Sequence, residues 1–382
     1  MDYKDKYKIY KIKYLELKKI VDIEGKKVIQ PKSIFMNPAI HAQKIPILGS
    51  VASNIVTKHC ERFKETKNAS ERIKTFANNF KIDHTSIEKC KNIKTPEECW
   101  SKFNTPNDFF IRERVGLPKT KSKYSLVSPA DCYCIYLPKA EKSNVWIKGK
   151  NFTPQKLMGA NISFDNYSLF IFRLAPQHYH RYHCPVNGRV LSITKLGKEK
   201  YSVDPIIVNS NIDVYSNNVR LVMKIELENK NIAYLAIIGA TCVASIEITN
   251  KSILSAYYKK YKNMRLTDVQ VNNTIDFTDM NVNIETNQEL GNFQYGGSTL
   301  VLIYPSIHKL TKNGIIIEYN SSKLKCDSMI KKFFKKLFSY IYTFVSEFTL
   351  SPKGLKLATL QSEECTISPV ETEIKVGYDI YE

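Results

Sequence analysis

VRLVMKIEL (residues 219–227), followed closely by IAYLAIIGATCVASIEI (residues 232–248), decides the fold that we expect for this chain. In the first segment apolar residues alternate with mostly polar neighbours, which is the period of a strand with one buried face. These apolar positions are Val219, Leu221, Met223, Ile225 and Leu227. The second segment is nearly all apolar and is interrupted at Gly239, which predicts two strands that are buried on both faces.

Further short runs of the same kind occur along the chain, and they are YSLVS (124–128), SLFIFRL (168–174), GRVLSITKL (188–196), STLVLIY (298–304) and GIIIEY (314–319). Before them, ILGSVASNIVTKHCERF (47–63), with Ser50 as a cap, and ASERIKTFANNF (69–80) have the spacing of helices. The pattern therefore predicts an α+β fold. Its core is mainly antiparallel β and sandwich-like or barrel-like, with an N-terminal helical region.

The composition limits the classes of partner. With 382 residues and 43% hydrophobic content, the chain can bury a full core. Its 57 Lys and Arg residues against 37 Asp and Glu residues give a net charge of +20, which attracts polyanions. Because zinc-finger spacing, an RNP-like aromatic strand and a dense basic helix are all missing, we expect no nucleic-acid partner. An anionic membrane surface remains a candidate partner, and a compositional bias without function remains the alternative.

Cysteine usage and the N-terminal segment indicate the compartment. The nine cysteines form an odd set without a CxxC pair, which is typical of reduced, intracellular thiols. The segment MDYKDKYKIYKIKYLELKK (1–19) is too charged for a secretory signal and carries acidic residues that a mitochondrial transit peptide avoids. No run approaches the roughly 20 apolar residues of a spanning helix. We expect an intracellular, peripheral membrane protein of the endomembrane system or endoplasmic reticulum rather than of mitochondria.

One late segment has helical periodicity. In MIKKFFKKLFSYIYTFVSEF (329–348) a Phe-rich face lies opposite a lysine cluster. This amphipathic helix either packs on the protein's own core or lies in the plane of a membrane. The surrounding stretch 322–368 carries eight lysines against four acidic residues, which favours the second hypothesis. The candidate membrane-contact residues are Phe334, Leu337, Phe338, Ile341, Lys335 and Lys336.

Histidine is concentrated in one short stretch. FRLAPQHYHRYHCPVNGRV (172–190) contains His178, His180 and His183, although the whole chain has only seven histidines. On an extended strand His183 would face away from the other two, so a three-histidine metal site would need a turn there. Acid–base catalysis needs only one imidazole near a reacting group and a second one for another proton transfer. A His-ligated metal hydrolase and an acid–base enzyme are both compatible with this block.

A glycine-rich turn, YGGSTLVLIYP (295–305), precedes the strand expected at 298–304. Taken together with the histidine block, this turn resembles the phosphatidylserine decarboxylase family. Members of that family carry an Arg-Leu-Ala-Pro-x-x-Tyr-His-Arg-x-His block and a late Gly-Ser-Thr self-cleavage site. The resemblance covers residues 105–320 and 369–380. Other matching segments, in order, are TPNDFFIRERV (105–115), LVSPADC (126–132), WIKGKNFTPQKLMG (146–159), SVDPIIV (202–208), IIGATCVASI (237–246) and ETEIKVGYDI (371–380).

The resemblance implies two reactions and assigns residues to them. In self-cleavage, Asp131 orients His183, His183 deprotonates Ser298, and Ser298 attacks the carbonyl of Gly297. The products are a β chain that ends at Gly297 and an α chain that begins at position 298 with a pyruvoyl group. In the second reaction this cofactor, with the help of His180, converts phosphatidylserine to phosphatidylethanolamine and carbon dioxide.

The same resemblance implies a carboxy-lyase that works as a homodimer without a metal ion. It assigns no role to His178, and Cys132 departs from the family by replacing a glycine. The alternative from another class is an uncleaved lipid-binding relative without activity. Such proteins usually lose the nucleophile or another member of the triad, whereas Asp131, His183 and Ser298 are all present in this chain.

The resemblance also predicts how the chain is divided. An N-terminal helical or irregular region covers 1–104. The catalytic domain covers 105–321 and 369–382, and an insertion with the amphipathic helix covers 322–368.

Overall fold

The computed structural model describes only part of the chain, and the described residues are 53–54, 57, 66–67, 69–117, 126–137, 139–142, 153–203, 205–208, 212–241, 246–262, 268–296, 298–305, 372–374 and 379–381. The chain divides into two compact units, 1–37 and 38–382, and every described residue belongs to the second. The helix expected at 329–348, the strand expected at 314–319 and the cap at Ser50 lie outside the described residues. The division into helical region, catalytic domain and insertion stays a prediction.

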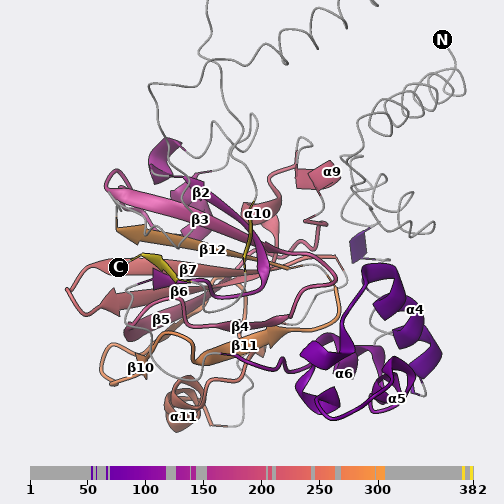
Figure 1. Ribbon diagram of the computed structural model, residues 1–382. Coiled ribbons are helices and arrows are strands. Elements are labelled where there is room, and N and C mark those ends of the chain that lie inside the picture. Colours follow the sequence, from indigo (N-terminus) through magenta and orange to yellow (C-terminus); the bar gives the residue numbers. More distant parts are fainter. Residues whose placement is uncertain are drawn as a thin grey trace, which may run out of the picture. The chain divides into compact units, whose positions relative to one another are not determined.

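Strands form the centre of this unit (Figure 1). They are β1 Leu126–Val127, β2 Cys132–Leu137, β3 Tyr167–Leu174, β4 Arg181–His183, β5 Gly188–Leu196, β6 Arg220–Leu227, β7 Ile232–Gly239, β8 Ile246–Ile248, β9 Thr274–Asp276, β10 Asn283–Ile284, β11 Glu289–Phe293, β12 Ser298–Pro305, β13 Thr372–Ile374 and β14 Asp379–Tyr381. All pairings between these strands are antiparallel. The α+β fold with a mainly antiparallel core is confirmed.

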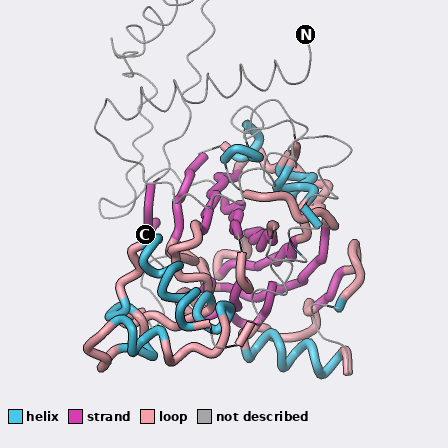
Figure 2. The backbone as a smooth tube through the Cα atoms, turned by 90° about the vertical axis from the view of Figure 1, so that its right-hand side faces the viewer, coloured by secondary structure: helices cyan, strands magenta, loops and turns pink. Residues whose placement is uncertain are grey.

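The largest sheet has the order β10-β5-β6-β7-β12-β3-β2-β13, and β9 also pairs with β5. A second sheet has the order β4-β11-β8, and β1 pairs with β14. In Figure 2 the strands occupy the middle of the described fold, with helices around them. Because β12 lies between β3 and β7, both of its edges are hydrogen-bonded along the sheet. The residues of β12 are therefore held more firmly than those of an edge strand.

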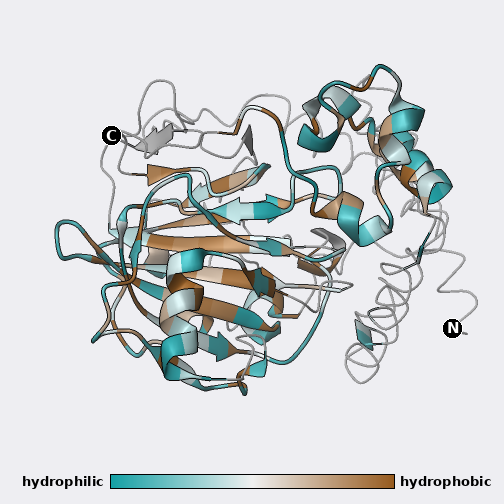
Figure 3. Ribbon diagram, turned by 90° about the horizontal axis from the view of Figure 1, so that it is seen from below, coloured by the Kyte–Doolittle hydropathy of each residue, from teal (hydrophilic) through white to brown (hydrophobic). Residues whose placement is uncertain are grey.

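The apolar run of β7 is explained by burial on both faces of the large sheet. Leu235 and Ile237 belong to one core cluster, whereas Tyr234, Ala236 and Ile238 belong to the other. Successive side chains of a strand point to opposite faces, so a strand covered on both sides needs apolar residues throughout. Figure 3 shows this hydrophobic colouring on the central strands and hydrophilic colouring on many of the loops.

Short helices and helical turns connect and flank the strands. Their bounds are α4 Ser70–Phe80, η1 His84–Ser86, η2 Glu88–Cys90, α5 Pro96–Trp100, α6 Pro106–Phe110, η3 Ala140–Lys142, α8 Pro154–Met158, α9 Pro205–Val208, α10 Val214–Asn217 and α11 Lys251–Lys260. None of the described helices is long and apolar enough to cross a membrane. Three of them, α5, α6 and α8, begin with the same Thr-Pro pair. In each, the threonine side chain accepts a hydrogen bond from a backbone N–H of the first turn, and the proline occupies a position that needs no donor.

Helix α4 confirms the helix expected at 69–80. It packs with α5 and α6 around a small core of its own, which includes Ile73, Trp100 and Phe109. The rings of Trp100 and Phe103 both meet Phe109 edge-on, with centroids 5.5 and 5.2 Å away. The helical unit 69–117 therefore has an aromatic centre separate from the clusters of the large sheet.

Cys90 and Cys99 form a disulfide within this helical unit, with Cα atoms 5.3 Å apart. The expectation that all thiols are reduced is therefore wrong for this pair. Sequence spacing could not show the pairing, because it depends on how η2 and α5 fold against each other. Cys132, Cys134 and Cys184 are buried.

Reduction of this disulfide is expected to destabilise the helical unit by about 2–3 kcal/mol, because the bond closes a short loop in the unfolded chain. The expected result is a lower unfolding midpoint for the wild-type chain in reductant. The Cys90→Ala/Cys99→Ala variant is the control, since reductant should not shift its midpoint further. An unchanged wild-type midpoint in reductant would contradict the prediction.

Candidate active site

Ser298 is the first residue of β12, where the chain enters the large sheet. It pairs with Leu174 of β3 on one side and with Gly239 of β7 on the other. Its side chain is fully buried, with 0% exposed. The alternation of a strand puts it on the same face as Leu300 and Leu302, which belong to the larger core cluster. A serine hydroxyl in such a place needs a polar partner.

That partner is His180. After β3 ends, the chain turns back through residues 175–180, and the turn is closed by a hydrogen bond from His178 N to Ala175 O at 2.9 Å. Ala175 N also donates to His178 Nδ1 at 3.0 Å. The turn brings His180 Nδ1 to 3.3 Å from Ser298 Oγ, and the imidazole is 0% exposed. The two residues are separated by 118 positions in sequence but form one buried pair.

Hydrogen-bond partners assign the tautomer of His180. Its Nε2 lies 3.1 Å from the carbonyl oxygen of Ala175, which can only accept, so Nε2 carries the proton. Nδ1 therefore has a free lone pair toward Ser298, and the serine hydroxyl is the donor. The pKa of His180 is well below its ordinary value, first because of burial and then because of the positive charge of Arg112. The imidazole is thus neutral and able to accept a proton.

Two residues from α6 and the segment after it hold His180 in place. The ring of Phe110 stacks on the imidazole, with centroids 3.8 Å apart and planes inclined by 24°. The buried Arg112 guanidinium donates to the carbonyl oxygens of Gln177 and His178, at 2.8 and 3.2 Å. Burial lowers the pKa of Arg112 to about 10, and it remains charged at neutral pH.

His183 lies on β4 and has different partners. Its Nδ1 donates to Asn287 O at 2.7 Å, which leaves Nε2 as the acceptor for the Tyr179 hydroxyl at 3.1 Å. Burial is the main cause that lowers its pKa, and the hydrogen bond to Asn287 opposes this, followed by the charge of Glu289 and, most weakly, that of Asp131. Both oxygens of Asp131 accept from Arg114 Nη1 at 2.6 Å. Asp131 and His183 lie in neighbouring segments, because His183 N donates to Pro129 O at 2.8 Å.

The structure therefore brings together some of the expected site residues and leaves others apart. Ser298 and His180 are in contact, and Asp131 and His183 lie on adjoining segments. Among the hydrogen bonds of the described residues, Ser298 bonds to His180 and not to His183. Gly297 and the membrane-contact candidates of 329–348 lie outside the described residues. His178 is 3% exposed, so it is a buried residue that closes a turn rather than a surface histidine.

Sequence reasoning missed several residues that build the site. The segment TPNDFFIRERV was recognised as a family match, but no role followed for Asn107, Phe110, Arg112 or Arg114. Two other contacts come from backbone carbonyls, those of Ala175 and Asn287. A carbonyl carries no side-chain signal, so these two contacts have no sequence signature.

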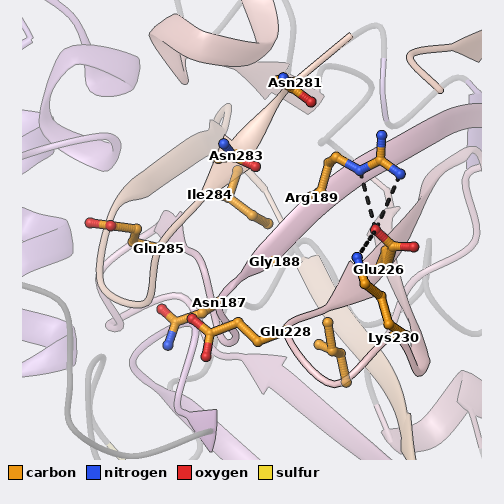
Figure 4. A pocket seen from close by; sticks show the side chains of 11 residues that line it. Asn187, Gly188, Arg189, Glu226, Glu228, Lys230, Asn281, Asn283, Ile284 and Glu285 are labelled. Atoms are coloured by element: carbon orange, nitrogen blue, oxygen red, sulfur yellow. Dashed lines mark hydrogen bonds and ion pairs between the residues drawn. The ribbon is translucent and has the colours of Figure 1, made fainter. Parts of the chain in front are cut away.

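Elsewhere, the described residues form a surface cavity of about 480 Å³ beside β5, β6 and β10 (Figure 4). The ion pairs of Arg189 and Lys230 with Glu226 lie along it. It includes neither Ser298 nor the histidines. Within the described part of the chain, no group of three or more His, Cys, Asp or Glu side chains could hold a metal ion.

These observations define a class of protein first: an antiparallel β protein with a buried serine–histidine pair where its central strand begins. The comparisons with known proteins then give the family. Residues 107–324 match the model of the phosphatidylserine decarboxylase family. The chain belongs to this family.

Individual relatives agree with the family model. The chain is 32% identical over 216 residues to a phosphatidylserine decarboxylase proenzyme of Clostridium botulinum, an alignment that covers 54% of this chain and 70% of that protein. It is 35% identical over 217 residues to phosphatidylserine decarboxylase proenzyme 2 of Saccharomyces cerevisiae, covering 54% of this chain and 17% of that protein. With a Fusobacterium nucleatum proenzyme the identity is 26% over 324 residues, covering 82% of this chain and 94% of that protein. The matched part thus spans only about a fifth of the yeast relatives and most of the bacterial ones.

Proposed function

We propose that this chain is the proenzyme of a pyruvoyl-dependent phosphatidylserine decarboxylase that cuts itself between Gly297 and Ser298. The observation that carries the proposal is the buried contact of Ser298 Oγ with a neutral His180, in a chain of this family. The contact puts a proton-exchanging imidazole beside the atom that would become the nucleophile and beside the position where the cofactor would form, so both proposed reactions meet at this pair. The names of the relatives support the substrate and the proenzyme state.

Self-cleavage uses only the chain itself and water. Ser298 Oγ attacks the carbonyl carbon of Gly297 and gives up its proton, the C–N bond breaks, and the nitrogen of residue 298 takes a proton. The ester that results loses a proton from Cα of residue 298, and its Cβ–O bond breaks. This step releases Gly297 as a carboxylate. The dehydroalanine that remains takes up water and loses ammonia, which leaves the pyruvoyl group without any oxidant.

His183 and Asp131 belong to the self-cleavage step in this proposal. By the family resemblance, His183 is the base that takes the proton from Ser298, and Asp131 orients the His183 imidazole. In the structure the His183 ring bonds to Tyr179 and Asn287, so this role requires the imidazole to exchange Tyr179 for Ser298. Such a change is compatible with catalysis, because catalytic hydrogen bonds often form only in the reacting state.

Position 298 fits the cofactor that the proposal requires. Residue 298 heads β12 between β3 and β7, and His180 Nδ1 lies beside its side chain, so these are the elements that would hold a group formed from Ser298. A pyruvoyl group supplies a carbonyl that holds the substrate amine and draws electrons as carbon dioxide leaves. In this proposal, which takes the role from the resemblance, His180 delivers the proton that the product carbon gains. An anionic substrate would raise the pKa of this imidazole and favour that role.

The partners follow from the same proposal. Phosphatidylserine is a membrane lipid, and the net charge of +20 favours an anionic bilayer as the surface where the enzyme works. The amphipathic segment 329–348 is the proposed contact. A homodimer of matured protomers, each made of an α and a β chain, is proposed from the resemblance. An intracellular location at the endomembrane system is proposed from the charged, acid-containing N-terminal segment 1–19.

The direct test combines intact-mass spectrometry with a lipid assay. The purified chain should separate into fragments 1–297 and 298–382, and the second should carry a pyruvoyl end. The cleaved protein should convert phosphatidylserine in vesicles to phosphatidylethanolamine with release of carbon dioxide. A cleaved protein without this conversion would contradict the decarboxylase assignment.

The rate of self-cleavage is expected to stay constant as the pH falls through 6.5. The pKa values of His180 and His183 are both lowered by burial, so either imidazole stays neutral below the usual histidine pKa. The same lowered pKa values make the free energy of unfolding depend on pH, in the direction opposite to that for a histidine whose pKa is raised by an acidic partner. The unfolded chain binds protons near pH 6.5 while the folded chain does not, so the fold loses stability as the pH falls below that value. Cleavage of freshly translated precursor should be timed between pH 5.5 and 8, with circular dichroism as a check of folding. A rate that halves near pH 6.5 while the fold persists would contradict the prediction.

A further inference from the structure

Asn107 connects helix α6 to the chain segment just before Ser298. Its Nδ2 donates to the side-chain oxygen Oε1 of Gln294, and its Oδ1 accepts from Tyr295 N at 3.0 Å. Gln294 is held further by a hydrogen bond from its Nε2 to Asn292 Oδ1 at 3.1 Å. One amide side chain thus fixes both a side chain and the backbone two residues before Gly297.

The chain makes a glycine-dependent bend directly after this contact. Gly296 has a φ of 144°, a backbone conformation that L-residues with a side chain rarely adopt. After position 297, which is not described, the chain is fixed again at Ser298 by pairing with β3 and β7. The chain is therefore fixed at Tyr295, two residues before Gly297, by Asn107, and at Ser298, one residue after it, by strand pairing.

Helix α6 is itself suited to act as one of these fixed points. Thr105 caps it by accepting from Asp108 N at 3.0 Å, and Pro106 begins its first turn. On the same helix, Phe110 lies 5.1 Å from the ring of Tyr295 and stacks on His180. The helix thus holds the segment before the cleavage site and the imidazole beside Ser298 at the same time.

We propose that Asn107 is a positioning residue for self-cleavage, which aligns the Gly297 carbonyl with the Ser298 hydroxyl by fixing the backbone at Tyr295. The inference rests on the proposed self-cleavage. Its physical reason is that an attack within one chain gains its rate from geometry, and a displacement of about 1 Å can cost about 10²-fold. Asn107 does not touch the reacting atoms, and its effect is on their alignment.

The experiment follows the conversion of precursor to two chains after cell-free translation of the full-length protein. Asn107→Ala should slow conversion by about 10- to 100-fold. Asn107→Asp keeps an oxygen that accepts from Tyr295 N, so it should cleave about tenfold faster than the alanine variant. Once cleaved, the alanine variant should decarboxylate at close to the wild-type rate per cleaved chain.

Thr105→Ala is the matched control. It removes the cap of the same helix and leaves both Asn107 contacts, so its precursor should cleave more slowly than the wild type but clearly faster than the precursor of Asn107→Ala. If Thr105→Ala and Asn107→Ala slowed precursor cleavage equally, the cause would be the lower stability of helix α6, and the positioning role of Asn107 would be overturned. Equal rates in wild type and Asn107→Ala would overturn it as well. A wild-type chain that never cleaves would overturn the proposed function itself, an outcome distinct from both.

Discussion

Replacing Ser298 with alanine is expected to leave the chain as one uncut polypeptide with no decarboxylase activity. The variant lacks the oxygen that would attack the Gly297 carbonyl, and alanine cannot be converted to a pyruvoyl group. Both reactions therefore fail together, and no residual rate is expected. Intact-mass spectrometry would show a single species of 44.0 kDa where the wild type gives two chains.

The fold should survive this change, so the loss is chemical and not structural. Ser298 is small, and its backbone pairing with β3 and β7 does not involve the hydroxyl. Ser168→Ala is the matched control, because it removes a buried serine hydroxyl from β3, opposite Tyr304 of β12. This control should cleave like the wild type. If Ser298→Ala still gave two chains, Ser298 would not be the nucleophile. If the wild-type chain stayed uncut, the alternative function, that of an uncleaved lipid-binding relative, would be favoured.

Much of the fold could be predicted because burial dictates residue type along a strand. The alternation in 219–227 marks β6, and the continuous apolar run in 232–239 marks β7 with both faces covered. The strand order could not be predicted, since β12 pairs with β3 and β7, which are distant in sequence. Local periodicity carries no information on such long-range pairing.

The part of the site that consists of reactive side chains could be predicted from the sequence. The resemblance selected Ser298, His180, His183 and Asp131, and the structure brings the first two into contact. It could not select the partners that set their protonation, because the carbonyls of Ala175 and Asn287 look like any other in the sequence. The Arg114 contact of Asp131 likewise depends on how the helical unit meets the sheet.

The two histidines are expected to separate the two reactions. His180→Ala should lower decarboxylation by about 10²–10⁴-fold per cleaved chain, the range typical of a lost proton-transfer group. Its Nδ1 is the imidazole atom beside position 298, where the substrate must react. His183→Ala should instead slow or stop cleavage, since the resemblance gives this residue the serine proton. The fraction of cleaved chain is measured first by mass, and the lipid turnover is then divided by it.

His84→Ala is the control, because His84 lies in the helical unit beside Asp83 and should affect neither reaction. A cleaved His180→Ala enzyme with wild-type turnover would remove this imidazole from decarboxylation. A His183→Ala precursor that cleaves at the wild-type rate would show that His183 is not the base of self-cleavage and does not exchange Tyr179 for Ser298. The serine proton would then pass to His180, whose unprotonated Nδ1 already lies 3.3 Å from Ser298 Oγ.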